Sequence, residues 1–338
     1  MATMIRKLKI KIALLGCLSP LLFASASRGQ TYKAVGEYKL SGSNARGIAV
    51  DAKNRRIYVA GDEGVAVLNA DTGANVGTVP FPGARDVLLI PVMTGEEQGA
   101  PVKGFATGDG SVISFALADL KPSHAQKLPT AGPSSLCYDD DSKTVEVVSE
   151  GGSLTTIDAG SNEIVHSAHL PTGSGQIACG TLGHVYVADT AANVVHVLNH
   201  ETSKSEGDYP MMTGHKPSGL ALDTKGRRLF VACEDSVVEI IDTDSGFTFI
   251  ELPGGAGPAR ETFAWTPQGK GKWKAAAFIS QEDGTLTGVK MNAYINYSVG
   301  GTYKLGPGLG SVAYDSATHH LFLTAVRSGT PVVVVASY

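Results

Sequence analysis

Three arginines stand at matching places in a repeated pattern of short apolar segments. Arg46, Arg85 and Arg260 each come just before such a segment, and His215 and Lys216 precede another copy of it. A guanidinium group can hold a carboxylate or a phosphate through two parallel hydrogen bonds. If the fold brings the copies together, these five residues predict a locally basic site for a small anion.

An alternative interpretation of the same arginines stays open. Each of them can instead pair with an adjacent acid, such as Asp86 or Glu261.

Acidic residues recur as well, one apolar segment later in most copies. They are Asp62-Glu63-Gly64, Asp109-Gly110, Glu150-Gly151, Asp189, Glu234-Asp235 and Glu282-Asp283-Gly284. Acid-glycine pairs suit tight hairpin turns for backbone reasons, whereas a calcium site needs several converging oxygens. We therefore interpret them as turns. Because zinc, haem and phosphate-binding motifs are also missing from the sequence, we expect no metal and no cofactor.

The elements that carry these residues are short strands. In the stretch 214–253, apolar alternation predicts strands at Gly219–Asp223, Arg228–Cys233, Val237–Asp242 and Phe247–Leu252. Copies of this four-strand unit begin at Gly47, Asp86, Ser135, Gln176, Glu261 and Ser311. A four-strand repeat of roughly 40 to 45 residues is typical of a β-propeller blade.

The count of strands predicts how the ring closes. The last copy supplies only three strands, at Gly310–Tyr314, His320–Ala325 and Pro331–Ser337, and Tyr32–Leu40 is available as a fourth. A closed ring leaves no open sheet edge. We therefore predict an all-β, seven-bladed propeller of four-stranded antiparallel blades, in which the N-terminal strand completes the C-terminal blade. In such a ring the three arginines lie around the mouth of the central channel.

The N-terminus has the features of a secretory signal. Basic residues precede an apolar run from Ile12 to Phe23, and Ala24-Ser25-Ala26 has the small-x-small form of a cleavage site. Cleavage after Ala26 is favoured over lipidation at Cys17, because the apolar run before Cys17 is only five residues long. We expect residues 1–26 to be a signal peptide, residues 27–338 to form one propeller domain, and the protein to be periplasmic or secreted.

The charge balance restricts the class of partner. Residues 1–26 hold four basic and no acidic residues, and removing them leaves 24 Lys and Arg against 32 Asp and Glu, a formal charge of −8. An acidic protein has no electrostatic attraction for nucleic acid or an anionic membrane. We expect a monomer without a membrane span that binds a small anion or a protein or peptide at the channel mouth.

Three cysteines follow the predicted signal peptide: Cys137, Cys179 and Cys233. Cys137 and Cys179 fall on neighbouring inner strands, so a bridge between them is conceivable, but their register differs by one residue. Buried free thiols are the favoured interpretation.

The repeat resembles a known family. The copy that begins at Pro217 is similar to the YVTN repeat of bacterial propellers, a group that includes YncE-like periplasmic proteins. Its residues follow the order P-x-G-x-A-x-D, then R-R-L-F-V-A, then V-V-E-I-I-D-T-D-S-G. This resemblance covers nearly the whole chain after the signal and implies a propeller that binds ligands or proteins.

A neighbouring family, the seven-bladed lactonases that include 6-phosphogluconolactonase-like enzymes, suggests the alternative function. The stretch G-A-G-P-A-R-E-T-F-A-W-T-P-Q-G from Gly255 resembles that family's G-x-G-P-R-H and F-x-P-x-G pattern. By this resemblance Arg260 and Glu282 are the candidate catalytic residues of a sugar-lactone hydrolase. Ala259 is inserted here, and Glu261 stands where the family has histidine. The sequence therefore predicts a binding scaffold, with lactone hydrolysis as the alternative.

Overall fold

The computed structural model describes residues 31–94, 97–123, 125–132, 134–180, 183–257, 259–267, 273–293 and 296–338. Within these ranges the regular elements are β-strands, with no α-helix. These ranges also contain no helix with the length and hydropathy needed to cross a membrane. The predicted signal peptide, with Ala26 and Cys17, lies outside the described residues.

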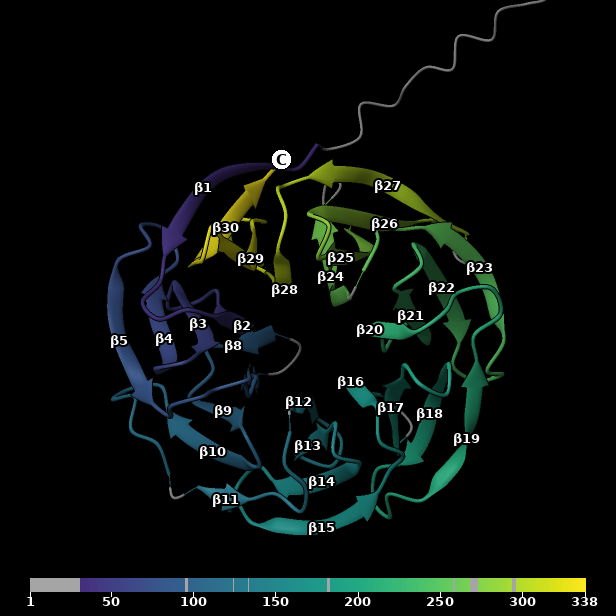
Figure 1. The fold of residues 1–338 in the computed structure, drawn as a ribbon, viewed down its shortest axis with the longest axis horizontal. Helices are drawn as coiled ribbons and strands as arrows, with labels where there is room; N and C mark the ends of the chain where they lie inside the picture. The colour runs from purple at the N-terminus through teal and green to yellow at the C-terminus, as the bar shows by residue number, and fades with distance from the viewer. Residues whose placement is uncertain are drawn as a thin grey trace, which may run out of the picture.

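Seven four-stranded antiparallel sheets stand around one ring, as Figure 1 shows. Blades 1 to 4, each from the inner to the outer strand, are β2 (Ala45–Asp51), β3 (Arg56–Gly61), β4 (Gly64–Asn69), β5 (Asn75–Pro80); β6 (Asp86–Leu89), β9 (Lys103–Gly108), β10 (Ser111–Ala116), β11 (Gln126–Lys127); β12 (Ser134–Asp139), β13 (Thr144–Ser149), β14 (Ser153–Asp158), β15 (Ile164–His169); β16 (Ser174–Cys179), β17 (His184–Asp189), β18 (Val194–Asn199), β19 (Ser205–Pro210).

Blades 5 to 7 are β20 (Pro217–Asp223), β21 (Arg228–Cys233), β22 (Val237–Asp242), β23 (Thr248–Pro253); β24 (Ala259–Pro267), β25 (Trp273–Gln281), β26 (Thr285–Ala293), β27 (Asn296–Lys304); β28 (Leu309–Tyr314), β29 (Leu321–Arg327), β30 (Thr330–Ser337), β1 (Lys33–Lys39). A small hairpin of β7 (Val92–Thr94) and β8 (Glu97–Gly99) is inserted between β6 and β9. The predicted seven-bladed propeller is confirmed, and the strand bounds predicted for blade 5 agree within two residues.

The blades hold together because each buries its apolar side chains against the next. Ile57 and Val59 of blade 1 lie in one buried cluster with Phe322 and Val333 of blade 7. The other clusters in the described ranges likewise join neighbouring blades, since the residues of second and third strands alternate between the two faces of each sheet. The small side chains of inner strands, such as Ala221 and Ala313, are buried where the sheets converge.

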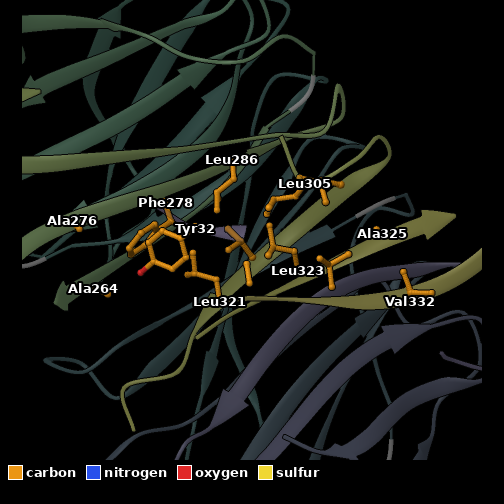
Figure 2. Packing of buried hydrophobic residues seen from close by; sticks show 14 residues of the cluster. Tyr32, Ala264, Ala276, Phe278, Leu286, Leu305, Leu321, Leu323, Ala325 and Val332 are labelled. Atoms are coloured by element: carbon orange, nitrogen blue, oxygen red, sulfur yellow. The ribbon is translucent and has the colours of Figure 1, made fainter. Parts of the chain in front are cut away.

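The predicted closure of the ring is confirmed. Strand β1 pairs antiparallel with β30, so the N-terminal strand forms the outer edge of blade 7, and Figure 1 shows the two strands side by side. Tyr32, just before β1, is only 6% exposed. Its ring makes edge-to-face contacts with Phe278 and Tyr303 of blade 6 at centroid distances of 5.4 and 5.6 Å. Figure 2 shows Tyr32 beside Phe278 in this cluster.

The prediction that Cys137 and Cys179 are free thiols is wrong. They form a disulfide between the inner strands β12 and β16 of blades 3 and 4, with 5.6 Å between their Cα atoms. The β16–β17 pairing contains a register shift between Ser174 and Ile177. Because of this shift, the place of Cys179 relative to Cys137 in the folded protein does not follow from counting residues along the two strands. Cys233 remains a buried free thiol, as predicted.

Candidate functional site

The mouth of the central channel opens into a cavity of about 490 Å³. Arg46, Arg85 and Arg260 all line it, and they come from blades 1, 2 and 6. Each arginine stands at the beginning of an inner strand, where the chain arrives at the channel axis. Because the inner strands converge there, residues that are far apart in the sequence share one cavity.

Arg46 is held by the hairpin of its own blade. Its Nη2 atom lies 2.7 Å from Oδ1 of Asp62, and its Nη1 atom donates to the carbonyl oxygen of Ala84 at 3.1 Å. The Asp62 carboxylate also accepts hydrogen bonds from the Ser43 hydroxyl and the Asn44 amide. Hydrogen bonds from Ser43 and then from Arg46 hold the pKa of Asp62 well below its usual range. This carboxylate therefore stays ionised and keeps Arg46 in place.

Arg85 repeats this arrangement one blade later. Its Nη2 atom lies 3.3 Å from Asp109, which belongs to the β9–β10 hairpin. Its backbone carbonyl accepts a hydrogen bond from the Gly47 N–H at 3.1 Å, which joins blades 1 and 2. A side chain at position 47 would collide with Asp86. Glycine at this position is therefore required for the two inner strands to approach each other.

Arg260 lies deeper than the other two arginines. Its Nη1 atom is 3.3 Å from the carbonyl oxygen of Ser218 in blade 5. Burial lowers the pKa of Arg260, and the negative charges of Asp86 and Glu150 oppose this shift. Burial also raises the pKa of Asp86, whose carboxylate accepts hydrogen bonds from the Val87 N–H and the Ser135 hydroxyl.

The arginines thus pair in a way that the sequence did not indicate. The alternative interpretation named adjacent acids such as Asp86 and Glu261 as partners, but Arg46 and Arg85 pair with the hairpin acids Asp62 and Asp109. The two repeated sets that the sequence presents separately, arginines and hairpin acids, are therefore parts of one structure.

His215 and Lys216 lie apart from the cavity. They are not among the residues that line it. Their side chains pair with the next hairpin: His215 Nδ1 lies 2.8 Å from Asp235, and Lys216 Nζ lies 3.5 Å from Glu234. Both are mostly exposed. The structure brings the three arginines together and leaves these two residues on the rim of blade 5.

Glu282 does line the same cavity as Arg260, and it is exposed. Asp86, Glu150 and Gln176 also line the cavity, although sequence reasoning did not include them in the site. The mouth is therefore mixed in charge, whereas the arginines alone predicted a basic one. The signal that could have found the missed residues is their repeat position. Asp86 is the first residue of β6, Gln176 is the third residue of β16, and Glu150 stands in a hairpin on the same end of the ring.

Within the described ranges, no group of three or more His, Cys, Asp or Glu side chains is arranged to hold a metal ion. The chemistry available at the mouth is the binding of charged groups by arginine and carboxylate.

Comparison with known proteins shows the fold. No protein-family model matches the chain, and no curated protein matches it. Among solved structures it is similar to the Pan2 WD40 domain of Neurospora crassa, with a TM-score of 0.69 and 12% identity over 91% of this chain and 95% of that one. It is also similar to a chain in the crystal structure of the Mitotic Checkpoint Complex, with a TM-score of 0.72 and 12% identity over 98% of both chains. The chain is therefore a seven-bladed β-propeller whose fold resembles that of WD40 domains.

Proposed function

We propose that this protein is a binding scaffold of the YVTN, YncE-like kind, whose channel mouth takes the anionic group of a small molecule or of a peptide segment of a partner protein. The observation that carries the proposal is the single cavity of about 490 Å³ lined by Arg46, Arg85 and Arg260. Two of these guanidinium groups are held in position by hairpin carboxylates, so little conformational freedom is lost when a ligand binds.

The similar structures support a scaffold role. One is a WD40 domain and the other belongs to a protein complex. By this analogy we propose that the propeller presents its channel mouth to a protein partner. We also propose that it works as a monomer.

A periplasmic or secreted location is part of the proposal. The apolar run with its Ala24-Ser25-Ala26 site supports it. The Cys137–Cys179 disulfide is an independent argument, because such bonds persist mainly in oxidising compartments.

Anion binding can be tested by a thermal shift. Succinate and gluconate are expected to raise the melting temperature by a few degrees at concentrations well above the dissociation constant, since a ligand that binds only the folded state stabilises it. Arg260→Ala should weaken binding roughly 10- to 100-fold, because a hydrogen bond to a charged group contributes about 1.5 to 3 kcal/mol. Arg46→Ala and Arg85→Ala should act similarly, and added salt should reduce the shift.

The matched control is Arg227→Gln. Arg227 pairs with the exposed Asp244 at 3.0 Å, in the turns at the opposite end of blade 5. This variant should retain the full shift. If no small anion changes the melting temperature, the proposed anion site is wrong, and protein binding is the part of the proposal that remains.

Lactone hydrolysis is a second candidate, favoured by one observation: Arg260 and Glu282 line the same cavity. Hydrolysis needs a base to activate water and a cation beside the developing oxyanion. If the protein hydrolyses gluconolactone, Glu282→Gln should lower the rate at least about 100-fold while the thermal shift with gluconate remains. A wild-type protein that does not accelerate lactone opening above the buffer rate would exclude this candidate.

A further inference from the structure

The cavity at the mouth continues into the channel. An inner cavity of about 220 Å³ lies next to it, and Asp86, Gln176, Arg260 and Ser311 line both. A ligand held at the mouth by Arg260 can therefore extend into the inner cavity.

Glu261 lines the inner cavity but not the mouth. It follows Arg260 directly on β24, and consecutive side chains of a strand point to opposite faces. Both of its carboxylate oxygens are shielded from solvent and make no hydrogen bond of normal geometry with the described residues. The backbone N–H of Ala232 on β21 interacts with this carboxylate and opposes the effect of burial on its pKa only in part.

Two other buried carboxylates, Glu239 and Asp86, differ from Glu261. Glu239 is fully buried, and its carboxylate accepts hydrogen bonds from the backbone N–H groups of Met212, Thr213 and Gly214 and from the Thr248 hydroxyl. Asp86 likewise accepts hydrogen bonds from blades 2 and 3. A buried polar group without partners is costly. Burial accordingly raises the pKa of Glu261 well above its usual value.

A hydrogen-bond donor that belongs to the ligand would be a suitable partner for this carboxylate. An ammonium group supplies both the hydrogen bonds and the charge that a buried carboxylate lacks. Arg260 and Glu261 both line the inner cavity of about 220 Å³. A group that meets Arg260 and a group that meets Glu261 can therefore belong to the same small molecule.

We propose that the ligand of the channel is a small zwitterion of the amino-acid type, whose carboxylate faces Arg46, Arg85 and Arg260 while its ammonium group faces Glu261. This inference rests on the proposed anion site and names its ligand class. The mixed charge of the lining, three arginines with Asp86, Glu150 and Glu282, is complementary to a molecule that carries both signs of charge.

A pair of matched ligands tests the inference. Glutamate and glutarate have the same carbon chain and the same two carboxylates, and only glutamate carries an ammonium group. By isothermal titration calorimetry, the wild-type protein should bind glutamate at least tenfold more tightly than glutarate. Glu261→Gln, which keeps the side-chain shape, should bind glutarate as the wild type does and lose the preference for glutamate. Glu251→Gln, an exposed change on the outer strand β23, should keep the preference.

The outcomes separate this inference from the proposed function. If the wild type binds the two ligands equally, the ligand is not recognised as a zwitterion, and the proposed anion site is unaffected. Binding of neither would count against the anion site itself. A preference for glutamate that survives Glu261→Gln would overturn the role of Glu261. The comparison on the wild-type protein decides the ligand class even if the variant fails to fold.

Discussion

A chain that lacks residues 32–40 is expected to aggregate, and what stays soluble should melt at a much lower temperature. This deletion removes β1 (Lys33–Lys39), the outer strand of blade 7, and exposes the backbone edge of β30. An open, apolar strand edge pairs readily with other chains. Four consecutive valines of β30, Val332–Val335, lie along this edge and are at most 4% exposed in the closed ring.

The loss goes beyond one strand, because Tyr32 ties the clasp to blade 6. Its ring contacts Phe278 and Tyr303, and it also contacts Tyr338 at 5.2 Å. Tyr38 in β1 donates from its hydroxyl to the carbonyl oxygen of Ala70 in blade 1. The clasp therefore touches blades 6, 7 and 1. Tyr32→Ala alone should lower the free energy of unfolding by about 3 kcal/mol, as large-to-small changes at buried aromatic sites do.

Size-exclusion chromatography and thermal unfolding would check this prediction. A chain that begins at Thr31 keeps β1 and is the control, and we expect it to elute and melt like the protein from residue 27. A truncated chain without residues 32–40 that remained soluble and monomeric, with an unchanged melting temperature, would show that the clasp does not hold the ring.

The second large effect concerns the disulfide between blades 3 and 4. Cys137 and Cys179 are 42 residues apart. A crosslink over a loop of this length lowers the conformational entropy of the unfolded chain, which stabilises the folded protein by about 4 kcal/mol in the chain-entropy model. The double variant Cys137→Ser, Cys179→Ser should therefore lose about 4 kcal/mol of unfolding free energy, measured by urea titration.

Two comparisons separate the crosslink from the cost of changing buried side chains. A reductant should destabilise the wild-type protein and leave the double variant unaffected. Cys233→Ala, a change at the buried free thiol, should leave the response to reductant intact. A wild-type protein whose unfolding curve is the same with and without reductant would contradict the disulfide.

The strands and their grouping into blades were predictable from the sequence, because both depend on local patterns. The alternation in Arg228–Cys233 and Val237–Asp242 predicted β21 and β22 with these same bounds. The missing fourth strand in the last copy, together with Tyr32–Leu40 at the other end, predicted the clasp, since a ring of strands must pair its edges. Blade 2 was harder to delimit: its outer strand is only Gln126–Lys127, and the β7–β8 hairpin interrupts its pattern.

The candidate site could be predicted only in part. Repeat position placed Arg46, Arg85 and Arg260 at one end of the ring, and the structure brings them to one cavity. The same reasoning grouped His215 and Lys216 with them, because repeat position says where a residue stands on the ring and not where its side chain points. Both side chains turn toward the acids of their own hairpin, Asp235 and Glu234.

What the sequence by itself determined is the architecture: the period of the strands, the number of blades and the closure, each set by interactions between near neighbours in the chain or by the need to pair an edge. Only the tertiary structure decided the contents of the channel. Whether Arg46 pairs with Asp62 or Asp86, whether Cys137 meets Cys179, and whether Glu261 finds a partner all depend on distances between blades. Those distances are set by the packing of the whole ring, in which a register shift of one residue in an inner strand redirects every side chain after it.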